Sequence, residues 1–165
     1  MKGVLTAALS VAALALLPAA AAASAEEAPT RAQYVERVDP ICQANTEANR
    51  RILKNVKTKA RSKSQRTVKE AGAQFIHASS AFGAAEKKIA AVPRPPADDA
   101  RLLKWFEYLD IVQTDLRKLG KALKEGEKIL AAHEKIRVER ASNAANNVSF
   151  VFEFRYCHLS ASSFS

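Results

Sequence analysis

The chain has 165 residues and a net charge of +9, from 26 lysines and arginines against 17 aspartates and glutamates. It contains only five glycines, and alanine, leucine, lysine and glutamate are abundant, which favours helices. Its length corresponds to one domain that can bury a real core. After residue 25 no stretch is apolar enough to span a bilayer, which excludes a later membrane-spanning segment.

Residues 1–25 have the pattern of a secretion signal. Lys2 supplies a positive start, residues 4–17 are apolar, and residues 23–25 form a small-x-small cleavage site. An uncleaved anchor is the alternative, but the apolar stretch is only marginally long enough to cross a bilayer. No cysteine lies near this site, so lipid attachment there is excluded. Cleavage would leave one domain, residues 26–165, with a charge of +8 because only Lys2 is lost, and predicts a location that is secreted or on the cell-envelope exterior.

The first predicted helix begins at Asp39 and Pro40, since aspartate is a good N-cap and proline fits the first helical position. Its apolar face is thin and consists of Ile41, Ala44, Ala48, Ile52 and Val56. Residues 30–38 are a candidate for a short preceding helix that is kinked at Pro40.

Two stronger helices follow, each with a heptad pattern. The second starts between residues 62 and 67, because residues 62–65 and 67–70 both fit a capping box, and it ends before Pro93. Its large and small seam residues alternate: Val68, Phe75, Phe82 and Ile89, with Ala71, Ala78, Ala85 and Val92 between them. The third covers residues 98–123, where apolar residues at alternating spacings of three and four predict a buried seam. These are Leu102, Trp105, Leu109, Val112, Leu116, Leu119 and Leu123.

The fourth predicted helix begins at about Glu127 and continues to about Val151. The residues expected to face inward are Ile129, Ile136, Ala141, Ala144 and Val148. From residue 148 to 156 the apolar pattern alternates as in a strand, so an extended tail is predicted after this helix. For residues 158–165 the sequence leaves order and disorder open.

Cys42 and Cys157 are the only cysteines, and in an exported protein such a pair predicts one disulfide. Two unpaired buried thiols or intermolecular pairing are the alternatives. The predicted fold is an all-α, up-down-up-down four-helix bundle whose N- and C-terminal ends are joined by this disulfide. In that topology the start of the first helix and the end of the fourth lie at the same end of the bundle, which agrees with the pairing.

Three stretches, residues 34–42 (YVERVDPIC), 95–98 (PPAD) and 152–157 (FEFRYC), resemble a family of small exported proteins from actinobacteria. Members of that family are mostly helical, often lipoproteins, and of unknown function. The resemblance therefore implies a helical fold and an exported location, and it supplies no activity. This chain departs from the family in three respects: it has no lipobox cysteine, it is basic rather than acidic, and Glu153 stands where a glycine usually precedes the final cysteine.

Residues 48–69 contain nine basic residues and no acidic one. They are Arg50, Arg51, Lys54, Lys57, Lys59, Arg61, Lys63, Arg66 and Lys69. In the predicted bundle they lie at the end away from the cysteines. Lys121, Lys124 and Lys128, in the turn between the third and fourth helices, lie at that same end. Such a cluster predicts docking to anionic lipid head groups, a wall polymer or a protein partner; a solvated basic loop is the alternative. Nucleic acid is the least favoured partner, because the window has no aromatic side chain for stacking.

Signals for chemistry are weak, and we predict no catalytic residue, no metal site and no cofactor. The three histidines, His77, His133 and His158, belong to no zinc, di-iron or haem-attachment motif. Glu107, Asp110 and Asp115 are interpreted as a polar helix face that opposes the lysine-rich helices, with an acid/base pair as the alternative. The sequence thus favours a non-enzymatic exported bundle, and the alternative is a small-molecule carrier or enzyme with a pocket between helices near Trp105.

Overall fold

The computed structural model describes residues 28–160, and all regular structure in that range is helical. The long helices are α1 (Arg31–Ile52), α3 (Gln65–Ala90), α4 (Asp99–Glu125) and α5 (Lys128–Ser149). The shorter elements are α2 (Val56–Ala60) and two 3₁₀ turns, η1 (Pro96–Asp98) and η2 (Phe150–Phe152). The all-helical prediction is confirmed. The predicted signal, residues 1–25, and the last part of the tail, residues 161–165, lie outside the described residues.

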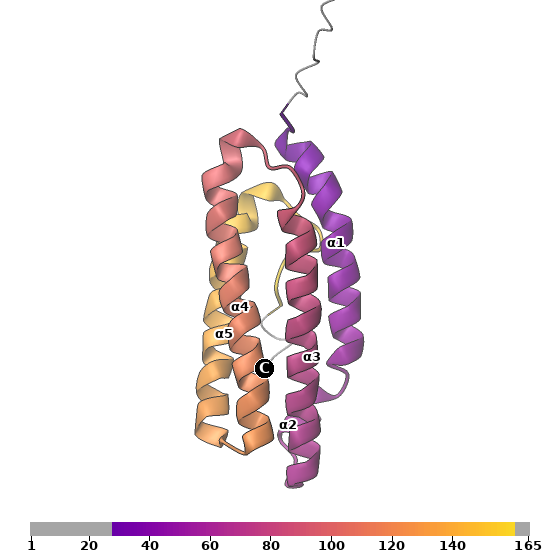
Figure 1. The fold of residues 1–165 in the computed structure, drawn as a ribbon, viewed down its shortest axis with the longest axis vertical. Helices are drawn as coiled ribbons and strands as arrows, with labels where there is room; N and C mark the ends of the chain where they lie inside the picture. Colours follow the sequence, from indigo (N-terminus) through magenta and orange to yellow (C-terminus); the bar gives the residue numbers. More distant parts are fainter. Residues whose placement is uncertain (1–27, 161–165) are drawn as a thin grey trace, which may run out of the picture.

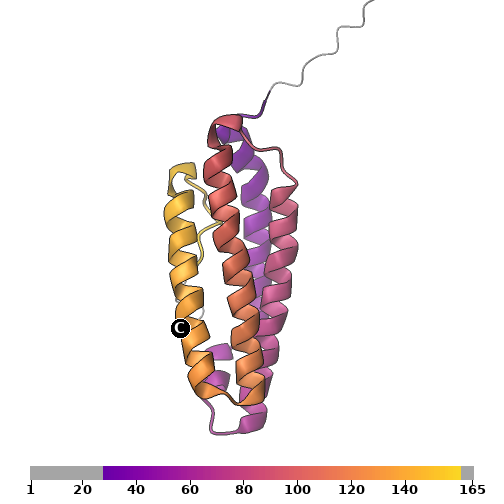
Figure 2. The same ribbon diagram turned by 60° about the vertical axis from the view of Figure 1, so that its left-hand side comes forward.

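The long helices lie side by side along the long axis of the molecule (Figure 1, Figure 2). α4 packs along both α3 and α5, whereas α1 packs against α3. One end of the molecule holds the start of α1, the α3–α4 connection and η2 (Figure 1). The opposite end holds α2 and the turn between α4 and α5 (Figure 1).

α1 begins at Arg31, so the prediction that the first helix starts at Asp39 and Pro40 is wrong. Thr30 caps the helix: its hydroxyl accepts the backbone N–H of Gln33 at 3.3 Å, and the Gln33 side chain accepts the backbone N–H of Thr30 at 2.8 Å. Pro40 lies inside α1 on its exposed side, where water can solvate the carbonyl group that loses its helical partner.

The apolar seam of the third predicted helix is confirmed, and that of the second is confirmed except that Ala85 and Val92 are half-buried and Val92 lies beyond the end of α3. All seven seam residues of α4 are buried, as are the four large seam residues of α3. The two helices meet most closely at Gly72 and Gly120. A Cβ atom on Gly72 would lie 2.5 Å from the carbonyl oxygen of Gly120, and one on Gly120 would lie 2.7 Å from that of Gly72. The two glycines therefore bring the α3 and α4 backbones into direct contact.

The face predicted for α5 is only partly buried: Ala141 is buried and Val148 packs against the core, whereas Ile129 is 89 % exposed and Ile136 is 44 % exposed. Its buried residues are mainly small: Ala131, Glu134, Val138, Ala141, Ser142, Ala145 and Ser149. An ion pair determines this register. Asp115 of α4 is 1 % exposed and accepts hydrogen bonds from Arg137 Nε at 3.1 Å and Nη2 at 3.3 Å. Asp115 thus faces a basic side chain of the next helix, as the polar-face interpretation expects, but it is buried and not solvated, and a buried carboxylate needs such a partner.

The chain after α5 turns back and fills the space between α1 and α5. Glu153 makes the turn with a φ of 55°, the left-handed region that glycine adopts most easily, and this is where the chain departs from the resembled family. The Asp39 carboxylate then accepts the backbone N–H groups of Arg155 and Tyr156 at 3.1 Å and 3.3 Å. On the other side, the Asn146 side chain exchanges two hydrogen bonds with the backbone of Leu159. The predicted non-helical tail is thus part of the packed structure.

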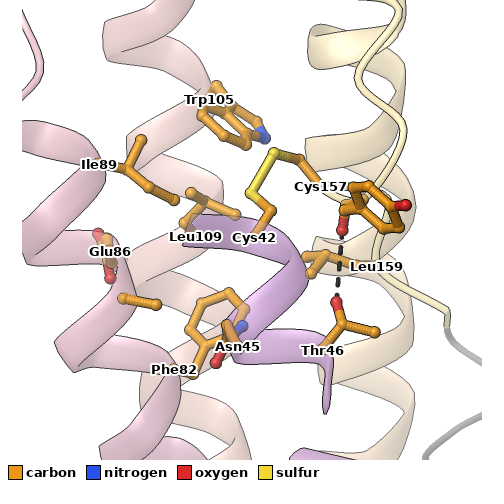
Figure 3. Close-up of a pocket in the computed structure, with 12 residues that line it drawn as sticks. Cys42, Asn45, Thr46, Phe82, Glu86, Ile89, Trp105, Leu109, Cys157 and Leu159 are labelled. Carbon is orange, nitrogen blue, oxygen red and sulfur yellow. Dashed lines mark hydrogen bonds between the residues drawn. A yellow bond between two sulfur atoms is a disulfide. The ribbon is translucent and has the colours of Figure 1, made fainter. Parts of the chain in front are cut away.

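The predicted disulfide between Cys42 and Cys157 is confirmed. Its place differs from the expectation, because Cys42 lies near the middle of the 22-residue α1 and not at the start of that helix. The returning C-terminal segment carries Cys157 down to this level (Figure 3). The disulfide therefore joins the middle of α1 to the returning segment, and does not lie at one end of the molecule.

We expect Gly72→Ala to lower the free energy of unfolding by about 1–3 kcal/mol, because the new methyl group meets backbone atoms that cannot move aside. Gly83→Ala is the matched control, since its methyl group meets only the Gln113 side chain, which can rotate. Urea denaturation followed by circular dichroism measures both. Equal losses for the two variants would contradict the close approach of α3 and α4 at Gly72.

Replacing Cys42 and Cys157 together by alanine should lower the free energy of unfolding by about 3–5 kcal/mol, because the disulfide closes a loop of 115 residues. Thermal unfolding of the oxidised protein, the reduced protein and the double variant measures this. The reduced protein should resemble the double variant, and an unchanged melting temperature in both would show that hydrogen bonds alone hold the returning segment.

Candidate functional site

The nine basic residues of the sequence window surround the connection between α1 and α3. Arg50 and Arg51 lie in the last turn of α1, Lys57 and Lys59 belong to α2, and the others lie in the connections or the first turns of α3. The α4–α5 turn lies at the same end, since Gly126 faces the side chain of Gln65 at the start of α3. We call these nine residues together with Lys121, Lys124 and Lys128 the basic end.

Most of the basic end is exposed and unpaired. Eight of the nine window residues are exposed, and Lys59 is half-buried. Among the described residues, the only acidic partner of the window is Glu70, whose carboxylate lies 3.6 Å from both Lys59 Nζ and Arg66 Nε. Glu125 and Glu127 in the α4–α5 turn reduce the charge further. A net positive field therefore remains at this end of the molecule.

The basic connection is anchored to the bundle, unlike the solvated loop of the alternative interpretation. The Gln74 side-chain amide donates hydrogen bonds to the backbone carbonyls of Ile52 at 2.6 Å and Lys54 at 3.2 Å. Val56 at the start of α2 is only 2 % exposed and packs into the core. Asn55 allows the turn into α2 with a left-handed φ of 61°. These contacts hold the backbone of the connection against the bundle at residues 52–56.

An open groove of about 430 Å³ lies against the basic end. Its floor is apolar, and Lys57, Arg61, Lys128 and Lys135 lie around it. This volume falls within the range of about 300–1,000 Å³ that is typical of ligand pockets. The sequence did not reveal the groove, because it depends on where α1 ends relative to α5. The thin apolar face predicted for the first helix was the only available signal.

The space beside Trp105, where the alternative function placed a pocket, is small. The cavity there has a volume of about 30 Å³ and is lined by the Cys42–Cys157 disulfide, Leu109 and Glu86 (Figure 3). Such a volume holds a water molecule or two and no larger ligand. The Trp105 indole N–H points toward the disulfide and has no hydrogen-bond acceptor among the described residues (Figure 3). The geometry at Trp105 therefore gives no support to a carrier or enzyme pocket.

Glu86 is the one carboxyl group lining this small cavity. Burial, together with the smaller effect of the nearby Asp110 carboxylate, raises the pKa of Glu86 to about 7. Residues 28–160 contain no group of three His, Cys, Asp or Glu side chains arranged to hold a metal. The raised pKa makes the half-buried Glu86 carboxyl a determinant of stability at neutral pH.

Comparison with known proteins gives no relative from which a role can be transferred: no family model, no curated protein and no solved structure matches this chain. Within residues 28–160, none of the helices is both long and apolar enough to cross a membrane. The function must therefore be argued from the basic end and the groove beside it.

We expect Glu86→Gln to stabilise the protein by about 1–2 kcal/mol at about pH 8 and to have little effect at about pH 4, after allowance for solvent screening. Because the pKa of Glu86 is raised to about 7, the folded state keeps a proton that the unfolded state releases above its ordinary value, so stability falls as the pH rises between these two pKa values. Melting temperatures at both pH values measure this, with Glu125→Gln on the surface as the control. An equal shift at both pH values would contradict it.

Proposed function

We propose that this protein is an exported helical bundle that docks its basic end onto an anionic component of the cell envelope, without a catalytic step. The observation that carries the proposal is the set of exposed, unpaired lysines and arginines on an anchored connection. In this proposal residues 1–25 are removed on export. The resemblance to small exported actinobacterial proteins and the disulfide agree with an oxidising exterior.

We further propose that the four long helices form an up-down-up-down bundle. The alternating courses of α1, α3, α4 and α5 in Figure 1 and the short connections between them support this topology. It brings the α1–α3 connection and the α4–α5 turn to one end, so that charges far apart in sequence form one surface.

Anionic lipid head groups are the partner that this surface suits best. Each lysine or arginine near an anionic membrane surface contributes about 1 kcal/mol of attraction, and the sum needs no precise geometry. Because these charges are exposed, salt screens the attraction. A wall polymer or an acidic protein would be attracted by the same field, while nucleic acid is disfavoured because the basic window lacks an aromatic side chain.

Replacing Lys57, Lys59, Arg61 and Lys63 by glutamine should weaken binding to vesicles of phosphatidylglycerol in phosphatidylcholine by about tenfold or more at low salt. Co-sedimentation at low and high salt measures this, and high salt should also release the unchanged protein. The matched control removes four exposed charges elsewhere, at Arg37, Lys87, Lys88 and Arg140. If both variants bind equally, attraction depends on overall charge and the basic end is not a docking surface.

A further inference from the structure

We propose that the groove at the basic end receives one acyl chain of an anionic lipid, whose head group lies among Lys57, Arg61 and Lys128. This inference rests on the proposed function and adds a lipid-binding site to it. It explains a feature that charge alone does not, namely an apolar depression of ligand size directly beside the basic side chains.

The groove lies where α1 has already ended. α1 ends at Ile52, and only the five-residue α2 covers the bundle from there to the basic end. In Figure 1, α1 ends well above the lower end of α3. One wall consists of Lys57 and Ala60 of α2 with Arg61 directly after it, and α5 contributes the other through Lys128, Ala131 and Ala132. A longer α1 would have covered the same floor.

The floor has the chemistry that an acyl chain requires. Phe75 of α3 and Leu119 and Leu123 of α4 form it, and all three belong to the same apolar core cluster. Each is less than 10 % exposed, so the bundle holds the floor in place. The walls add the small side chains of Ala60 and Ala132, which leave room for a chain. No acidic side chain lines the groove.

The rim suits an anionic head group. Lys57, Arg61 and Lys128 are exposed, and within residues 28–160 none of them is engaged in an ion pair. Lys135, the fourth cation at the rim, is already paired with Glu139 at 2.9 Å. A phosphate at the mouth of the groove would therefore find three cations whose charge is not neutralised by a neighbour.

A second, independent observation favours a lipid over a soluble anion. Ile129, immediately after Lys128 in the α4–α5 turn, is 89 % exposed, and Leu130 is 43 % exposed. Two large apolar side chains at the tip of a basic end match a surface that enters the interfacial region of a bilayer. A free phosphate or a sugar phosphate would gain nothing from them.

The test uses lysophosphatidylglycerol monomers with hexanoyl, decanoyl and myristoyl chains, each below its critical micelle concentration. Affinity should rise with chain length, by about fourfold for each methylene that the groove buries. Methyl NMR of the full folded protein should show contacts between the chain and Leu119, Leu123 and Ala131. Lysophosphatidylcholine of the same chain length should bind more weakly, because the rim then meets no net negative charge.

Ala132→Phe fills the groove without changing the charge, so it should abolish the dependence on chain length and leave salt-sensitive vesicle attraction in place. Ala100→Phe is the matched control, an exposed alanine on α4 outside the groove. Ala60→Phe fills the groove from the opposite wall if the first variant does not fold.

The outcomes separate the two proposals. Binding of the unchanged protein that is salt-sensitive but independent of chain length would overturn the groove site and leave the docking surface standing. If the unchanged protein binds neither the lipid monomers nor the vesicles at low salt, both the groove site and the docking surface are overturned. Equal chain-length dependence in Ala132→Phe and Ala100→Phe would place the chain elsewhere and also overturn the groove site.

Discussion

The rest of this structure depends on the contacts that join α1 to the other helices. α1 packs against α3, and its connection to the α5 side runs through the returning C-terminal segment. That segment is bonded to α1 by the Cys42–Cys157 disulfide and the Asp39 carboxylate, and to α5 by Asn146. A stretch without regular structure thus takes the place that a direct helix–helix contact would otherwise occupy, and its backbone polar groups need partners that side chains supply.

This arrangement gives the two ends of the molecule different cores. At the end where α1 begins, Tyr34, Trp105, Phe152 and Phe154 pack together, with ring centroids 5.4–6.4 Å apart. Burial there raises the pKa of Tyr34 to about 12. Arg31 holds this end together through a bidentate ion pair with Asp98, with bonds of 2.6 Å and 2.9 Å, and its guanidinium lies over the Phe152 ring.

At the opposite end the core cluster contains no residue of the returning segment, and α1 reaches this cluster only with Ile52 in its last turn. Small residues and the Gly72–Gly120 contact bring the helices close, and α2 together with Ile52 and Leu53 covers the remaining side. Because little of the chain covers this end of the bundle, the groove stays open and the basic connection is exposed. The apolar groove and much of the charged surface thus lie at the same place, beyond the end of α1 at Ile52.

The sequence by itself determined the helical class, the seams of α3 and α4 and the disulfide. Heptad spacing is a local pattern, and two cysteines allow only one pairing within the chain. It also identified the basic window. Only the tertiary structure decided the start of α1, the register of α5 and the groove. Asp39 has the appearance of a helix cap, yet its partners are 116 and 117 residues away. Ile129 and Ile136 fit an inward pattern, yet the Asp115–Arg137 pair and the small residues of α5 turn them outward. Each of these outcomes depends on a partner distant in sequence, which a local pattern does not contain.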